Sequence, residues 1–299
     1  MLPALALSLA LLAVTPGPCA APTTSPAVDI RNAVGNDVSN HQPNPHSNSA
    51  AESSSGEDSA AENELLEWAN QNRALAGVPP LRMEESLREA ARAHARRMVQ
   101  SGQLEHQLSG EPSLLERIAE VSPLKMDRAG ENIAYATCAL SANDVLMRST
   151  PHRENLLDRG FNVAGVAAIW SKGRLYVVED FAHQVPSYTA EQSRQLVARA
   201  IDEMRQQAEL TALVQLTPSN LNEAACSLAR ESRPNAHLLA TAYDNRKIIT
   251  YTQSRPEILP PGALRLLRDP GVRQFAVGAC YARNAAYPTG TYWIAILLY

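Results

Sequence analysis

The sequence predicts an α+β protein with two domains. Two observations support this class: amphipathic helical segments precede pairs of strand-like runs, and the same order of segments comes a second time along the chain. The length of 299 residues also allows two domains. We expect the first to span residues 63–185 and the second residues 190–299.

Residues 1–20 have the composition of a secretory signal peptide. The run from Leu2 to Val14 is almost wholly apolar and is shorter than the roughly 20 residues that a membrane-spanning helix needs. Small residues follow it, although no Lys or Arg precedes it. We therefore predict a secreted or periplasmic protein. Lipidation of Cys19 is the alternative, and Pro18 directly before it fits a lipoprotein signal poorly.

Residues 21–62 are expected to form a disordered linker. They are rich in Ser, Asn, Pro, Ala and acidic residues, so they cannot bury enough apolar surface to offset chain entropy. His41 and His46 lie in this stretch, where a solvated tail is a better interpretation than a metal site. No later run approaches membrane-spanning length, so no integral membrane segment is expected in the mature chain.

Helices should open the first domain. Apolar positions from Leu65 to Leu75 fit one amphipathic helix, and those from Leu87 to Met98 fit a second, which Gly102 ends. His94 lies on the apolar stripe of the second helix, so we predict a hydrogen-bonded core histidine rather than a ligand. A third helix is expected over residues 114–121.

Two short helices and a hairpin should complete this domain. Ser141 and Thr150 carry side chains typical of N-caps, so a helix is expected after each. Strand-like runs cover residues 163–170 and 175–181. The turn Ser171-Lys172-Gly173 between them predicts a hairpin.

The second half follows the same pattern. The expected elements are helices over residues 196–210 and 219–232, and strands over 275–282 and 289–299. We interpret residues 190–299 as a diverged second copy of the first domain; convergence on one helix-then-hairpin pattern is the alternative. Nothing like Gly130-Glu131-Asn132 occurs there, and its one histidine is His237.

Charge and cysteine content narrow the class of protein. A formal net charge of -4 and a pI of about 6.0 argue against a nucleic-acid binder, which usually carries a basic face. If Cys19 leaves with the signal peptide, three cysteines remain, and one has no partner within the chain. Of these, Cys226 and Cys280 could form a disulfide in an oxidising compartment. Three buried thiols, with Cys138 as the third, are the alternative.

One group of residues has the chemistry of a site. His106, Glu131 and His152 come from three separate stretches and could meet in one cleft. Neutral imidazole is a common ligand of transition metals, so His106 and His152 are the candidate metal ligands, with a divalent ion such as Zn²⁺ as the cofactor. His152 lies in the first turn of its expected helix, whose positive end should keep the imidazole neutral.

The carboxylate of Glu131 allows several roles. It could complete the metal's ligand set, orient an imidazole, or act as a general base. Alternatively it ties the two histidines together as pure scaffolding. Asn132, Arg153 and Asn155 are expected to give structural support: Arg153 could bridge to the carboxylates of residues 179–180, and Asn155 could bond loop backbone.

Six motifs in order across residues 63–183 resemble the CAP superfamily, also called SCP (cysteine-rich secretory, antigen 5 and pathogenesis-related 1 proteins), and are most similar to its shorter bacterial branch. They are Asn72-Arg73 with Gly77-Val78-Pro79-Pro80-Leu81, Ala91-Arg92-Ala93-His94-Ala95-Arg96-Arg97-Met98, His106, Gly130-Glu131-Asn132-Ile133-Ala134, Ser149-Thr150-Pro151-His152-Arg153-Glu154-Asn155-Leu156-Leu157, and Val177-Val178-Glu179-Asp180-Phe181.

The resemblance implies an α-β-α sandwich whose cleft carries two histidines and one or two acidic residues. By motif position these are His106, Glu131 and His152, while the family's second glutamate has no good match here. Bacterial members usually carry Trp in the helix before the second histidine, where this chain has Met147 and Thr150.

The function expected from the residues and the resemblance is that of an exported, non-enzymatic protein that binds a ligand, metal or partner through the cleft. The ligand would be an unknown small molecule or lipid, and the partner an envelope or extracellular protein. One alternative is a metal-dependent hydrolase that uses Glu131 as general base. The other is a cell-envelope interaction module with a vestigial cleft. No Gly-x-Ser-x-Gly or His-Glu-x-x-His motif supports a hydrolase.

Overall fold

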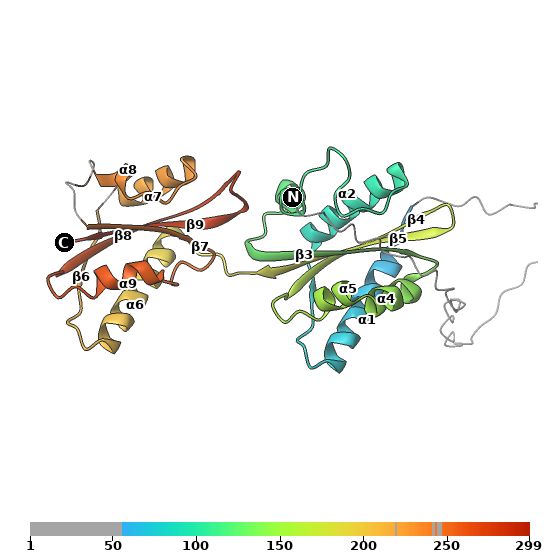
Figure 1. Cartoon of the computed structure of the whole chain (residues 1–299), viewed down its shortest axis with the longest axis horizontal. Coiled ribbons are helices and arrows are strands. Elements are labelled where there is room, and N and C mark those ends of the chain that lie inside the picture. Colours follow the sequence, from blue (N-terminus) through green and yellow to red (C-terminus); the bar gives the residue numbers. More distant parts are fainter. Residues whose placement is uncertain (1–55, 219, 241–242, 244–246) are drawn as a thin grey trace, which may run out of the picture.

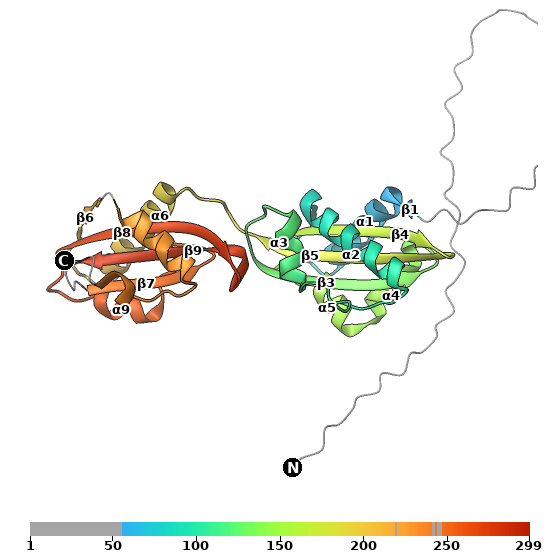
Figure 2. The same ribbon diagram turned by 90° about the horizontal axis from the view of Figure 1, so that it is seen from above.

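The computed structural model shows two mixed α/β domains lying end to end, each with a central sheet between layers of helices (Figure 1). It describes residues 56–218, 220–240, 243 and 247–299. The predicted signal peptide with Cys19 lies outside the described residues, as does the linker up to residue 55 with His41 and His46. Both views show two distinct domains (Figures 1 and 2). Along the chain, the segment that follows the first sheet connects them.

The first domain is an α-β-α sandwich. Its sheet has the order β1-β4-β5-β3, and β2 pairs in parallel with β4. The strands are β1 (Gly56–Glu57), β2 (Arg82–Met83), β3 (Met126–Ala136), β4 (Val163–Ser171) and β5 (Arg174–Gln184). One face carries α1 (Ser59–Leu75), α4 (Ala139–Arg148) and α5 (Thr150–Leu156), and the other carries α2 (Glu85–Ser101) and α3 (Leu114–Val121) (Figure 1).

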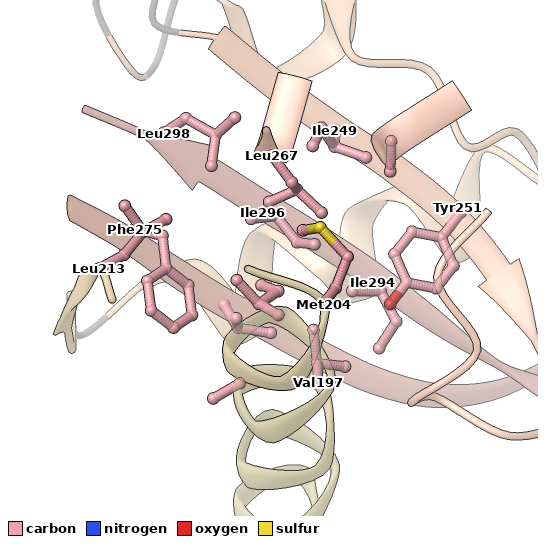
Figure 3. Close-up of a cluster of buried hydrophobic side chains, with 14 of the residues drawn as sticks. Val197, Met204, Leu213, Ile249, Tyr251, Leu267, Phe275, Ile294, Ile296 and Leu298 are labelled. Atoms are coloured by element: carbon pink, nitrogen blue, oxygen red, sulfur yellow. The ribbon is translucent and has the colours of Figure 1, made fainter. Parts of the chain in front are cut away.

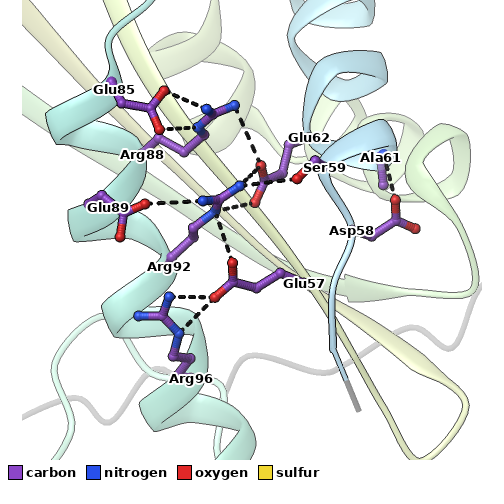
Figure 4. A network of polar contacts seen from close by, with 10 residues as sticks. All are labelled: Glu57, Asp58, Ser59, Ala61, Glu62, Glu85, Arg88, Glu89, Arg92 and Arg96. Carbon is purple, nitrogen blue, oxygen red and sulfur yellow. Dashed lines mark hydrogen bonds and ion pairs between the residues drawn. The ribbon is translucent and has the colours of Figure 1, made fainter. Parts of the chain in front are cut away.

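Ordered structure begins before the predicted end of the linker. Asp58 caps α1 by accepting a hydrogen bond from the backbone N–H of Ala61, and β1 pairs with β4. Glu62, which is fully buried, binds Arg92 of α2 through both carboxylate oxygens at 2.8 and 2.7 Å (Figure 4). The linker prediction is therefore wrong for residues 56–62, because charged side chains that read as solvated in the sequence form this network with α2.

The starts of α4 and α5 differ by one to three residues from the sequence prediction. Cys138 and Ser149, not Ser141 and Thr150, occupy the N-cap positions of α4 and α5. Gly102 ends α2 as predicted, with a left-handed φ of 70°. The predicted hairpin is confirmed too: β4 and β5 meet in a turn whose residues Lys172 and Gly173 both have positive φ, as tight hairpin turns require.

The second domain has a four-stranded sheet in the order β6-β8-β9-β7. Its strands are β6 (Val214–Leu216), β7 (Lys247–Gln253), β8 (Gln274–Asn284) and β9 (Tyr287–Leu298), and its helices are α6 (Ala190–Gln207), α7 (Leu221–Arg230), α8 (His237–Ala240) and α9 (Pro261–Leu267). Side chains from α6, α9 and one face of the sheet form a core around Val197, Ile294 and Ile296 (Figure 3).

The two sheets are connected in the same way. β6 pairs in parallel with β8 as β2 does with β4, and β7 pairs with β9 as β3 does with β5. Each sheet also has a glycine against a helix: an added Cβ at Gly165 would lie 2.1 Å from the Leu87 carbonyl carbon, and one at Gly278 would lie 2.1 Å from the Leu221 oxygen. Strand β7 was missed in the sequence. Descent from a duplicated domain stays a prediction.

Cys226 and Cys280 form the disulfide that was one of the two alternatives. It ties α7 to β8, and the described part of the chain contains no free cysteine. A bridge that closes a loop of 54 residues removes much of the freedom of the unfolded chain, an effect of about 4 kcal/mol in the chain-entropy model.

Within the described residues, no helix is both long and apolar enough for a membrane crossing.

Candidate functional site

The candidate site lies at β3, the edge strand of the first sheet. Glu131 stands on this strand opposite Asp180 of β5, and its side chain is only 4% exposed. His106, in the loop after α2, is 58% exposed, and its Nδ1 lies 2.8 Å from Oε1 of Glu131. A carboxylate can only accept, so Nδ1 of His106 carries the hydrogen and Nε2 is left for solvent or a ligand.

The second oxygen of Glu131 is held by a residue that the motifs did not indicate. Arg117 of α3 places Nη2 2.6 Å from Oε2 of Glu131 and Nη1 3.5 Å from Oε1 of Glu111. All three side chains are at most 7% exposed. A buried charge pair of this kind is expensive to break, because removing one partner leaves the other unpaired in a poorly solvated site.

His94 is the hydrogen-bonded core histidine that the sequence predicted. Its Nε2 lies 3.0 Å from the carbonyl oxygen of Glu105, and its Nδ1 lies 2.9 Å from Oε1 of Glu111. Burial alone would raise the pKa of Glu111, but the hydrogen bonds from His94 and Leu108 and the charge of Arg117 bring it below its ordinary value. The ionised form of Glu111 is therefore favoured between Arg117 and His94.

Asp180 adds a buried carboxyl group to the same face of the sheet. Complete burial, and next the negative charge of Glu131, raise the pKa of Asp180 well above its ordinary range. A hydrogen bond between the two carboxyl groups raises this pKa further. Glu131 is thus the centre of the group, with His106, Arg117 and Asp180 around it.

The opposite face of the sheet holds the second histidine. Asn132 is fully buried, and its Nδ2 donates to the backbone oxygen of His152 at 3.0 Å and to Oε2 of Glu179 at 3.1 Å. Burial raises the pKa of Glu179 to about 7, against the opposing effect of the Asn132 hydrogen bond. Asn155 donates to the backbone oxygen of Glu131 and to the Asn132 side chain, both at 3.2 Å.

Arg153 has a structural role, but its expected partners are wrong. Its guanidinium donates to the backbone oxygen of Met147 at 3.0 Å and reaches the hydroxyl of Thr150, rather than bridging to Glu179 or Asp180. Both carboxyls are 1% exposed on the sheet, beneath the helices. Arg153 instead braces the junction of α4 and α5, and so supports His152 only through the position of its helix.

His152 comes close to His106 across the edge of β3. Their ring centroids are 6.4 Å apart, and Nδ1 of His152 is buried without a hydrogen-bond partner among the described residues. Burial, and then the charge of His106, lower the pKa of His152. The lowered pKa has the predicted direction, and its causes are burial and then the neighbouring histidine.

These contacts limit which metal site the residues could form. Glu131 could become a third ligand only by giving up its contact with His106 or Arg117. Without Glu131, only the two imidazoles remain as ligands. Across the described ranges, no group of three or more His, Cys, Asp or Glu has an arrangement suited to a metal ion. Catalytic zinc sites have three protein ligands, so the residues do not fit a catalytic zinc ion. The buried Nδ1 of His152 and the Nε2 of His106 fit at most a two-ligand site.

The sequence motifs did not indicate Glu111, Arg117 and Asp180 as parts of the site. Two signals were present. Asp180 interrupts the apolar strand Val177–Phe181, and Arg117 adjoins the buried Ile118 on a short helix. Both are charged residues at positions that usually hold buried apolar side chains. Neither pattern indicates which partner neutralises the charge.

Comparisons with known proteins agree with this architecture. The model of the cysteine-rich secretory protein family, CAP, matches residues 66–181. The protein YkwD of Bacillus subtilis (strain 168) is 30% identical over 116 residues, which are 38% of this chain and 44% of that protein. The chain thus spans less than half the length of this relative.

Two solved structures are similar in fold. An extracellular protein containing a SCP domain from Bacillus anthracis str. Ames is 22% identical over 42% of this chain and 41% of its own, with a TM-score of 0.38. A cysteine-rich secretory protein from Staphylococcus aureus subsp. aureus Mu50 is 21% identical over 42% and 39%, with a TM-score of 0.33. The family match covers the motifs from α1 to β5, so the first domain is the part of the chain that matches the CAP superfamily.

Proposed function

We propose that this chain is an exported, non-enzymatic binding protein whose ligand contacts the imidazoles of His106 and His152. One observation carries the proposal: Nδ1 of His152 is buried and unpartnered 6.4 Å, centroid to centroid, from the ring of His106. A buried polar atom without a partner costs roughly 1–3 kcal/mol, so a ligand that satisfies it gains that amount. The carboxylate of Glu131 offers no comparable opening, because His106 and Arg117 engage its two oxygens.

The ligand class follows from the two nitrogens. Burial lowers the pKa of His152 and so favours its neutral form. In neutral His106 the lone pair is on Nε2, because Nδ1 donates to Glu131. Neutral imidazoles bind transition-metal ions such as Zn²⁺, and two of them leave further coordination positions for solvent or another molecule. Such a site binds more weakly than one with three protein ligands. An organic ligand with a hydrogen-bond donor would fit the same nitrogens.

A hydrolase is disfavoured by the position of Glu131. A general base must lie within hydrogen-bond reach of the water or substrate that it deprotonates. The carboxylate of Glu131 is 4% exposed and binds Arg117 at 2.6 Å. Its role is to fix the His106 ring, which suits binding.

Three observations support export. Residues 1–20 have the composition of a signal peptide, and Cys226 and Cys280 are joined in a disulfide. Disulfides persist in oxidising compartments and are rare in the cytosol. The similar Bacillus anthracis protein is described as extracellular.

Calorimetric titration of the purified protein with Zn²⁺ tests the site. We expect one ion per chain, and loss of binding in both His106→Ala and His152→Ala. His237→Ala, which removes a histidine from the second domain, is the matched control and should bind as the parent does. A folded parent that takes up no zinc would remove the metal from the proposal and leave organic ligands, to be tested with lipid vesicles and envelope extracts. Binding that survives both substitutions would refute the site.

A further inference from the structure

Residues 114–131, here called the α3–β3 segment, carry Arg117 and Glu131 and are held by the second domain. Arg283, near the end of β8, donates Nη1 to the backbone oxygen of Ala119 at 2.9 Å and Nη2 to that of Ser122 at 2.7 Å. The last carbonyls of a helix have no intrahelical partner, and a cation there is favourable. Figure 2 shows α3 beside the end of the β8–β9 hairpin.

Lys125 is the second attachment. Its ammonium lies 3.8 Å from the ring centroid of Tyr281 and 5.0 Å from that of Tyr292, and 3.3 Å from the Tyr292 hydroxyl. The same hydroxyl accepts the backbone N–H of Tyr188 in the connection between the domains, at 2.7 Å. Tyr292 is 1% exposed, so a lysine of the first domain is anchored on the core of the second.

A third contact lies where β3 begins. Asp127 accepts a hydrogen bond from the hydroxyl of Ser254 at 3.1 Å through Oδ2, while its Oδ1 lies 2.6 Å from His183 of β5. The second domain therefore contacts the α3–β3 segment at residues 119–122, 125 and 127. These positions lie between Arg117 and Glu131 in the chain.

The stiffness of this segment matters for the site. A helix as short as α3, with 8 residues, is marginal without tertiary support. Arg117 can hold Oε2 of Glu131 at 2.6 Å only if α3 keeps its place over β3. Glu131 in turn accepts from Nδ1 of His106 at 2.8 Å.

We propose that the second domain is a positioning element of the His106 site. Through Arg283 and Lys125 it fixes α3, and α3 fixes Arg117 on Glu131, so the second domain helps to set the orientation and tautomer of His106. Arg283 touches no ligand and acts through the helix. The inference rests on the proposed function only in taking His106 as a binding residue.

The experiment uses the full chain without metal, at pH 8. Imidazole ¹⁵N NMR reports the tautomer of His106, and amide hydrogen exchange reports the stability of α3. In Arg283→Ala we expect exchange in α3 to quicken at least about tenfold and His106 to shift from the Nδ1–H form towards a mixture of tautomers. Arg283→Lys should give an intermediate result, because an ammonium can reach one of the two carbonyls.

Two further variants separate positioning from general instability. Arg230→Ala removes a guanidinium that pairs with Glu223 at 2.8 Å on the surface of the second domain, and should change neither signal. Arg117→Met should reproduce the His106 shift with the domain interface intact. The double variant Arg117→Met/Arg283→Ala should then show no further His106 shift, because both changes act on one chain of contacts.

If Arg283→Ala does not fold, Lys125→Met is the milder test, since it keeps an aliphatic contact with the tyrosines. An Arg283 or Lys125 variant that loosens α3 while His106 keeps its tautomer would overturn the proposal, as would additive effects in the double variant. Because this experiment uses no metal, its result can be interpreted even if the zinc titration fails. The two proposals therefore fail independently.

Discussion

Arg205 holds in the second domain the place that Arg73 holds in the first. Nε of Arg73 donates to the backbone oxygen of Pro79 at 2.7 Å, and Nε of Arg205 donates to that of Thr211 at 2.8 Å, in each case six residues further on. Nη1 of Arg73 reaches the oxygen of Leu156 at the end of α5, and Nη1 of Arg205 reaches that of Leu267 at the end of α9. This match supports the duplication more specifically than the helix and strand pattern does.

Replacing either arginine should destabilise its own domain. Arg73 is fully buried and Arg205 is 2% exposed, so Arg73→Met or Arg205→Met would strand carbonyl oxygens that each cost roughly 1–3 kcal/mol when unpaired. We expect a loss of about 3 kcal/mol or more in the free energy of unfolding, measured in urea. Arg230→Met is the surface control and should change it by less than about 0.5 kcal/mol. A loss below about 1 kcal/mol in both buried variants would contradict this account.

Alanine at Gly165 or Gly278 should disrupt the packing of a helix on a sheet. The added Cβ would lie 2.1 Å from backbone atoms of Leu87 or Leu221, and backbone cannot move aside as a flexible side chain can. We expect each variant to lose about 3 kcal/mol or more, or not to accumulate as folded protein. Gly262→Ala is the control, because nothing lies within 4 Å of its added Cβ. If Gly165→Ala or Gly278→Ala melted at the same temperature as the parent, the close distance between helix and sheet would not be required for stability.

The pH titration of His152 should have its midpoint below 6.5. Burial is the larger cause of its lowered pKa and the charge of His106 the smaller, so His106→Ala should raise the midpoint only in part. Since the folded state takes up this proton less readily, His152 should destabilise the fold as the pH falls below 6.5. NMR measures the midpoint, with His237→Ala as a control that leaves it unchanged. A midpoint above 6.5 in the metal-free parent would refute the burial argument.

Glu179 should make the stability of the first domain fall as the pH rises. Its pKa is raised by burial from 4.5 to about 7, so the folded state holds the proton through this interval and loses stability as the proton leaves. Glu179→Gln keeps an acceptor for Asn132 without the charge. At pH 8 we expect the free energy of unfolding of this variant to exceed that of the parent by up to about 3 kcal/mol. Near pH 4.5 the two values should differ little.

Urea unfolding at the two pH values measures this difference. The exposed Glu64 of α1 offers a matched control, because Glu64→Gln should leave the pH dependence unchanged. An equal effect of Glu179→Gln at both pH values would mean that Glu179 carries the same charge throughout.

Local patterns in the sequence were sufficient for most elements and for part of the site. The apolar stripe of α2, the glycine that ends it and the turn at Lys172-Gly173 are local features, and the structure confirms each. The pairing of His106 with Glu131 is present, and the ring of His152 lies close to that of His106. In these cases the spacing of residues along the chain already carries the information.

The structure of residues 56–62 and strand β7 did not follow from the sequence pattern. The sequence placed Glu57 and Glu62 in the linker, because charged side chains are usually exposed to solvent. In the structure, Arg92 and Arg96 of α2 neutralise their charges (Figure 4). Strand β7, Lys247–Gln253, lies after residues with little periodicity, and its pairing with β9 defines it.

The sequence by itself determined the family, the α+β class and the two histidines with Glu131, because these depend on residue types at fixed spacings. Only the tertiary structure decided what surrounds them. Arg117 takes the second oxygen of Glu131, burial raises the pKa of Asp180, and Arg283 of the second domain caps the helix that carries Arg117. Charge state and orientation depend on burial and on partners distant in sequence, which no local pattern encodes.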